Sequence, residues 1–312
     1  MSFSSAIPAR DLPTSLNVRL AWLFLFFFGC FYYAIPIFLA RSPVAFWIGL
    51  PVAILTGPLS YALWNLIHES IHGNFSNNRS QNQFWGRCLA ILFGTQFAVL
   101  KAGHLMHHKY NREVGDRIEF FELRSAYPRW LQSLRYYFRI TLATYCFEVL
   151  VGLFLALPTN LTKPISTKIS KLPIEEAFFK WVYKPEILSE IRKDLFFTAM
   201  IYAPSVWLFG KHCWILCIAL LLRAFFVSFF DNAYHYGKEI DDKNSAYNLY
   251  LPFRLSGYFF HFNYHRIHHR FPGVPWNRLP VQMEASGDIW DRGFWGQAWS
   301  QWGGLLDEPR KD

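Results

Sequence analysis

Charged residues are scarce in this 312-residue chain. They make up 17% of the sequence, whereas soluble domains carry about 25%. Hydrophobic residues account for 53%, and they are gathered into long runs instead of being spread at the spacing of a soluble core. This distribution excludes an ordinary soluble protein and predicts a single membrane-embedded domain over residues 1–312.

Several motifs are also missing. The five cysteines form no CxxC pair, which excludes a zinc knuckle and predicts reduced packing residues. No GxGxxG segment offers a nucleotide site, and no His-Pro-Gly-Gly segment marks a fused haem domain. The net charge is +9, but no RNA-binding signature accompanies it, so no nucleic-acid partner is expected. Attraction to anionic lipid head groups explains the basic residues that flank the apolar runs.

The apolar runs predict helices that cross a membrane in two hairpins. A span of about 30 Å needs roughly 20 apolar residues, and the first two runs are long enough. Cys88–Leu100 is too short, so we expect an interfacial or re-entrant helix there. Parity requires that one of the three later runs does not cross or that two of them fuse, and we expect Tyr136–Leu157 to lie along the interface. The predicted hairpins consist of Val18–Ala40 with Phe46–Ile67, and of Phe196–Gly210 with Trp214–Phe230, turning near Lys211.

The polar segment Thr159–Asp194 is rich in lysine. Basic loops prefer the cytoplasmic side of a membrane, so we expect this segment, and the polar groups that follow the hairpins, to be cytoplasmic.

Histidine spacing is the most informative feature. Eight of the 11 histidines fall into three groups, here called the first, second and third histidine boxes. Residues three and four apart lie on the same face of a helix, so each box could aim its imidazoles at one point. The boxes are His68 and His72; His104, His107 and His108; and His265, His268 and His269.

These ligands predict a centre with two metal ions. Neutral imidazole suits zinc, copper, iron and nickel, and eight imidazoles exceed what one ion can bind. A structural zinc would close with four ligands, often cysteines. Two redox-active ions with positions open to dioxygen account for the excess, and iron is favoured over copper. The predicted fold is therefore an all-α integral membrane protein with about four transmembrane helices, interfacial helices and a cytoplasmic, histidine-rich cap that holds two metals.

The residues around the boxes strengthen this reading. HESIHGNF follows an apolar run, GHLMHHKYNR comes some thirty residues later, and FNYHRIHHRFPGVPWNRLP lies near the C-terminus. In order and wording they resemble the membrane fatty-acid desaturases and related lipid oxygenases, from about residue 65 to 280. The resemblance implies a di-iron centre ligated by all eight box histidines and by His235 in DNAYHYG.

Other polar residues have less certain roles. His261 could be a ligand, a partner of a ligand, or neither, and His212 is given no role. Ligating imidazoles need groups that hold their other nitrogen. Four residues lie close enough in sequence to do so: Glu69, Asp116, Asp231 and Asn263.

The predicted reaction is oxygen-dependent desaturation of a fatty acyl chain, carried as a thioester or in a glycerolipid. Hydroxylation or ketolation of a lipid, alkane or carotenoid is the alternative, because the same site could return oxygen to the substrate. Metal transport or storage is less favoured, since transporters usually place ionisable ligands inside their spans. Electrons must come from a separate donor, and the resemblance implies a ferredoxin or a small haem cytochrome docked on the cytoplasmic face.

Overall fold

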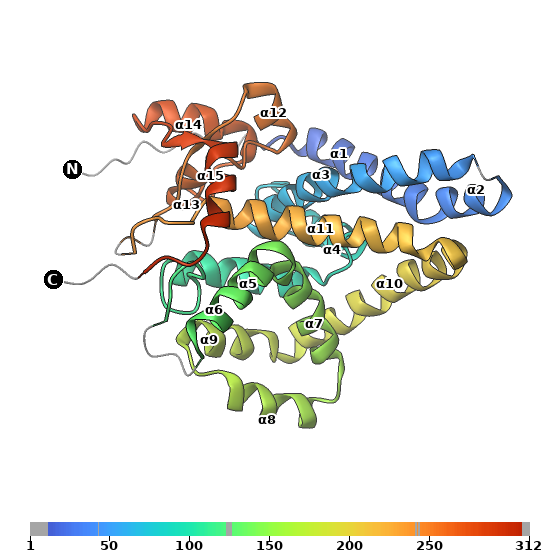
Figure 1. The fold of residues 1–312 in the computed structure, drawn as a ribbon, viewed down its shortest axis with the longest axis horizontal. Coiled ribbons are helices and arrows are strands. Elements are labelled where there is room, and N and C mark those ends of the chain that lie inside the picture. The colour runs from blue at the N-terminus through green and yellow to red at the C-terminus, as the bar shows by residue number, and fades with distance from the viewer. Residues whose placement is uncertain (1–11, 43, 123–126, 241, 243, 308–312) are drawn as a thin grey trace.

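The computed structural model describes residues 12–42, 44–122, 127–240, 242 and 244–307, and it is built almost entirely from helices (Figure 1). Four helical stretches are long and apolar enough to cross a membrane. They are Thr14–Arg41, Phe46–Ile71, Arg129–Ala156 and Pro185–Ala233.

The first predicted hairpin is confirmed. Its first arm consists of α1 (Thr14–Gly29), a π-helical turn η1 (Cys30–Ala34) and α2 (Ile35–Arg41), and its second arm is α3 (Ala45–Ile71). Long, mainly apolar runs explain both arms. The last turn of α3 is polar and carries the first histidine box.

The short apolar stretch after this hairpin forms two helices instead of one. Helix α4 (Arg79–Phe93) and helix α5 (Phe97–Tyr110) meet at an angle of 101°, as in a broken span or a re-entrant loop. Asn78 caps α4 by accepting hydrogen bonds from the backbone N–H groups of Ser80 and Gln81. Gly94 ends α4 with a φ of +90°, a conformation that favours glycine.

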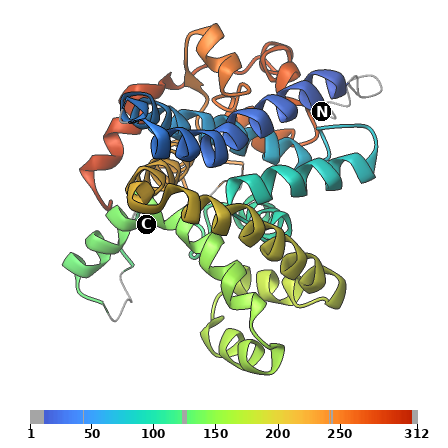
Figure 2. The same ribbon diagram turned by 90° about the vertical axis from the view of Figure 1, so that its right-hand side faces the viewer.

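The central part of the chain lies outside the two hairpins. It contains α6 (Arg129–Phe138), a π-helical turn η2 (Arg139–Ala143), α7 (Thr144–Ala156), α8 (Thr159–Ile169) and α9 (Pro173–Val182). Figures 1 and 2 show α7 running across the direction of α3 and α11. The stretch Arg129–Ala156 is nevertheless long and apolar enough to cross a membrane, so the interfacial position of 136–157 stays a prediction.

The second predicted hairpin is also confirmed. Helix α10 (Pro185–Phe209) and helix α11 (Cys213–Ala233) are joined by a 3₁₀ turn, η3 (Gly210–His212), which contains Lys211. Gly210 has a φ of +48°, and the chain reverses direction there (Figure 1). Helix α11 packs along α3, so the two hairpins share an aromatic core that includes Tyr61 and Phe230.

The C-terminal part forms a cap over the ends of α3, α5 and α11 (Figure 1). Its two short strands pair in parallel, with Leu249 opposite Arg292. The elements of the cap are β1 (Leu249–Tyr250), α12 (Phe253–Tyr258), α13 (His265–Arg270), η4 (Trp276–Arg278), α14 (Leu279–Ala285), β2 (Arg292–Gly293), α15 (Phe294–Ser300) and η5 (Gln301–Gly303).

Candidate metal centre

Four separate elements bring the histidine boxes together. The first box lies at the C-terminal end of α3, with His68 and His72 one helical turn apart. The second box occupies the last two turns of α5, and the third box lies on α13. His235 comes two residues after the end of α11. Because α3 and α11 pack side by side and end under the cap, histidines far apart in sequence meet in one place.

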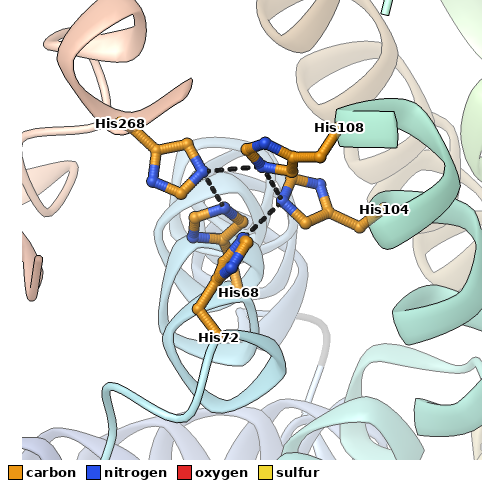
Figure 3. Close-up of side chains that lie close together, drawn as sticks. All are labelled: His68, His72, His104, His108 and His268. Atoms are coloured by element: carbon orange, nitrogen blue, oxygen red, sulfur yellow. Dashed lines mark hydrogen bonds between the residues drawn. The ribbon is translucent and has the colours of Figure 1, made fainter. Parts of the chain in front are cut away.

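Five of these histidines form one cluster, shown in Figure 3. The Nε2 atom of His268 lies 3.0 Å from that of His68 and 2.9 Å from that of His108. The Nε2 atom of His104 lies 2.8 Å from that of His72 and 2.9 Å from that of His108. We call His68, His72, His104, His108 and His268 the five-histidine cluster.

The other four form a second cluster. The Nε2 atom of His265 lies 3.0 Å from that of His235 and 3.1 Å from that of His269. The ring of His107 completes the group, with its centroid 4.7 Å from that of His235. We call His107, His235, His265 and His269 the four-histidine cluster.

The second and third boxes are each divided between the clusters. His104 and His108 belong to the five-histidine cluster, whereas His107 points to the other cluster. In the third box His265 and His269 stay together, and His268 crosses to the five-histidine cluster. Each of these two boxes thus aims two of its three imidazoles at one point and directs the third to the other cluster. Residues four apart share a helix face, while the third member is rotated away from them.

The chemistry of these donors fits a metal ion in each cluster. Nitrogen ligands about 2.1 Å from an ion and at right angles to each other are about 3 Å apart, which matches the spacing in both clusters. Burial lowers the pKa of His72 to about 3, and it also lowers the pKa of His235, His265 and His269, where neighbouring imidazoles add to the effect. These four imidazoles are thus neutral at pH 7, which is the form that binds metal, whereas the Asp116 carboxylate raises the pKa of His107.

The four proposed partners of the ligands have different surroundings. Asp116 contacts Nδ1 of His107 at 2.8 Å, as expected of a group that orients a ligand. Glu69 accepts a hydrogen bond from the backbone N–H of Trp276, which ties α3 to the segment after the third box. Asp231 lies one turn before His235 and lines a cavity beside it. Asn263 is wrong as a histidine partner, because its amide bonds the Leu249 carbonyl and its Oδ1 accepts from Ser256.

The two remaining histidines named from the sequence are outside both clusters. His261 lies 2.7 Å from the Ser256 hydroxyl through its Nδ1 atom and packs against Trp276. His212 lies in the turn between α10 and α11, at the far end of the hairpin from the clusters (Figure 1).

Two further residues support the centre and were not identified from the sequence. The Asn111 side-chain amide donates to Nδ1 of His269 at 3.4 Å. Arg112 forms a buried ion pair with Glu119, with 2.6 Å between Nη2 and Oε1, and donates to the His235 carbonyl at 3.2 Å. Both residues directly follow α5. Their polar side chains gave no signal in the sequence, because a basic residue after a helix is usually exposed.

Cavities reach both clusters. One of about 280 Å³ lies beside the four-histidine cluster and is lined by His107, Asp116, Glu148, Asp231 and His235, among others. A larger one of about 920 Å³ reaches His72 and is lined by polar residues together with Phe97, Leu105 and Trp181. Molecules can therefore approach the centre from two directions.

A helical chain with apolar spans and two buried histidine clusters defines a membrane-associated protein built to hold metal. Comparison with protein families gives the narrower class. The fatty acid desaturase family matches residues 45–296, which is most of the chain and includes every box. The chain belongs to the fatty acid desaturase family, and it is therefore an oxidoreductase by family. A comparison with curated proteins finds no match.

Proposed function

We propose that this protein uses two iron ions to catalyse the oxygen-dependent desaturation of a fatty acyl chain. The observation that carries the proposal is the convergence of nine histidines, six of them buried and three half-buried, into a five-histidine and a four-histidine cluster. The match to the fatty acid desaturase family supports the same reaction. Electron-rich, all-imidazole ligand sets suit redox metals better than they suit a closed structural zinc site.

Each cluster would hold one ion through its imidazole nitrogens. When bound, the ions activate dioxygen, so that two hydrogens can be removed from neighbouring methylene carbons. The residues of the chain supply the geometry. Asp116 holds His107 through Nδ1, which fixes the tautomer and direction of that ring and leaves its other nitrogen free for a metal. Burial of six of the nine cluster histidines limits the contact of the centre with bulk water.

The larger cavity is the proposed route for the substrate. His72 lines this cavity, and Arg79, Lys101 and Glu190 line it as well. Two cations beside one carboxylate favour a head group with negative charge, such as the phosphate shared by thioester carriers and glycerolipids. The apolar side chains of Phe97, Leu105 and Trp181 are suited to the first methylenes of an acyl chain.

Electrons would come from a separate donor, a ferredoxin or a small haem cytochrome, on the side of the membrane where the clusters lie. We assign this side to the cytoplasm, because the segment 159–194 is rich in lysine and arginine.

The test is to measure metal content and product formation together. Purified protein would be supplied with a reductase, a ferredoxin and labelled acyl substrates, alongside His107→Ala and the control His212→Ala. Two irons per chain and a new alkene, both diminished in His107→Ala and both kept in His212→Ala, would support the proposal. A hydroxylated or ketonic product would indicate the alternative oxygenase reaction. Zinc alone, with no oxygen consumed, would overturn the proposal and direct attention to metal transport or storage.

A further inference from the structure

Arg223 is a buried arginine at the middle of an apolar helix. It lies about halfway along α11, and its exposed fraction is 1%. Charged residues within membrane spans are expensive to bury and usually mark a function. Arg223 touches no substrate cavity described above. Its role must therefore lie in what its guanidinium holds.

The guanidinium joins five other helical elements. Its acceptors are all uncharged: three phenols, one hydroxyl and one backbone carbonyl. Nε donates to Ser60 on α3 at 3.1 Å, Nη1 donates to the Phe93 carbonyl of α4, to Tyr202 on α10 and to Tyr145 on α7, and Nη2 donates to Tyr32 of η1.

These contacts complete the hydrogen bonding of one helix end. The last four carbonyls of a helix have no partner within the helix, and α4 ends next to the apolar core. The Ala90 and Ile91 carbonyls accept from the backbone N–H groups of Thr95 and Gly94. Within the described part of the chain, no backbone N–H donates to the Leu92 or Phe93 carbonyl in this way.

The phenols and Arg223 bind those two carbonyls. Tyr32 and Tyr202 donate to the Leu92 carbonyl, at 3.2 and 2.8 Å. Tyr145 donates to the Phe93 carbonyl at 2.7 Å, beside Arg223. The positive charge thus faces the C-terminal end of α4, where the helix dipole is negative.

Gly94 shows how tightly this end is held. A β-carbon added at Gly94 would lie 2.8 Å from the hydroxyl of Tyr145 and 3.0 Å from that of Tyr202. The two phenols therefore pack closely against Gly94, the residue at which the chain turns from α4 into α5. A second interaction holds α4 closer to its N-terminus, where Arg87 forms an ion pair with the buried Asp194 of α10 at 2.6 Å.

We propose that Arg223, with Tyr32, Tyr145 and Tyr202, is a positioning residue that fixes the bend between α4 and α5 and so sets the second histidine box. Helix α5 begins at Phe97 and carries His104 seven residues later, roughly 10 Å along a helix axis. Its three histidines serve both clusters. A change in the direction of α5 at the bend would therefore move ligands of both metal ions at once.

The experiment measures iron binding at the metal centre. It rests on the proposed function, because it needs iron to bind the two clusters. Arg223→Met and Arg223→Lys would be compared with Arg19→Met, which removes an exposed arginine from α1. Each protein would be loaded with iron(II) without oxygen, and its iron content and Mössbauer spectrum recorded on the monodisperse fraction. We expect Arg223→Met to lose at least half of its iron and to show an altered spectrum, and Arg223→Lys to be restored in part.

A neighbouring pair of tyrosines allows a second test that keeps the positive charge of Arg223. Tyr32 belongs to the network, whereas the Tyr33 hydroxyl donates to the Ile201 carbonyl outside it. The double variant Tyr32→Phe, Tyr202→Phe should shift the spectrum, and Tyr33→Phe should leave it as in the wild type. Equal spectra in all of these proteins, Arg223→Met included where it folds, would overturn the inference. Failure of the wild type to bind two irons would instead overturn the proposed function.

Discussion

The Nε2 atoms of His68 and His268 lie 3.0 Å apart although 200 residues separate them in the sequence. The first belongs to the last turn of α3 and the second to α13 in the C-terminal cap. This contact joins the first and third boxes and requires both hairpins to bring the chain back to the same side. The five-histidine cluster therefore depends on the whole path of the chain.

Removing His268 should empty the five-histidine cluster. Its ring contacts both His68 and His108 through Nε2, so His268→Ala takes away a donor at the centre of the group. We expect loss of about one metal ion per chain and a fall in activity of more than about 100-fold, since loss of an outer partner alone costs 10–100-fold. Metal analysis and product formation would measure this. His212→Ala is the matched control, and equal metal content in the two variants would contradict the ligand assignment.

Asp116→Asn should weaken the four-histidine cluster without emptying it. The Asp116 carboxylate lies 2.8 Å from Nδ1 of His107 and holds the ring with Nε2 directed at the cluster. The neutral amide oxygen of asparagine accepts the hydrogen bond from His107 Nδ1 less strongly than the carboxylate does. We therefore expect a 10–100-fold loss of metal affinity or activity. Competition with a chelator of known affinity would measure it. Glu122→Gln removes an exposed carboxylate from the same connection and should change nothing; equal affinities for both variants would contradict an orienting role for Asp116.

The second box shows most clearly which features could be predicted from the sequence and which could not. Spacing was sufficient to pick out the eight box histidines and the turn near Lys211, because both depend on local patterns, whereas His235 was named from the family resemblance. Spacing could not assign His107 to a different cluster from His104 and His108, since that depends on where α11 places His235 and where the cap places α13. The bend at Gly94 was also missed. An apolar stretch shows the length of a helix, whereas its direction depends on partners such as Arg223, far away in sequence.

Acid should destabilise the protein below about pH 6.5. Burial lowers the pKa of His72 from 6.5 to about 3 in the folded chain, while the unfolded chain keeps the ordinary value. Between these two pKa values the unfolded state binds more protons, so the free energy of unfolding falls as the pH falls, by up to about 1.4 kcal/mol per pH unit for each such group. The free energy of unfolding of the metal-loaded protein should also fall as the pH falls, because protonated imidazole cannot bind metal.

Thermal unfolding in detergent at pH 8, 7, 6 and 5 would measure this dependence. We expect a constant midpoint above pH 7 and a falling midpoint below pH 6.5, with a smaller slope in His72→Asn. A midpoint that is the same at pH 5 and pH 7 would show that the cluster imidazoles are not neutral in the folded state.

The buried ion pair between Arg112 and Glu119 should matter far more to stability than an exposed pair. Both side chains are 1% exposed, and Arg112 also donates to the carbonyls of His235, Lys238 and Glu239. Arg112→Met leaves the Glu119 carboxylate buried without its partner, which typically costs about 3–5 kcal/mol. It also releases the segment that carries His235, so metal affinity at the four-histidine cluster should fall with stability.

The chain offers its own control for this change. Arg129 and Asp307 form an ion pair that is largely exposed, with 64% and 79% of their side chains accessible, and exposed pairs contribute little. Arg129→Met should therefore leave the unfolding midpoint and the metal content nearly unchanged. The double variant Arg112→Met, Glu119→Met removes both buried charges and should be more stable than Arg112→Met alone. If the double variant is no more stable than the single one, the cost comes from the lost bonds to the backbone carbonyls, and not from an unpaired charge.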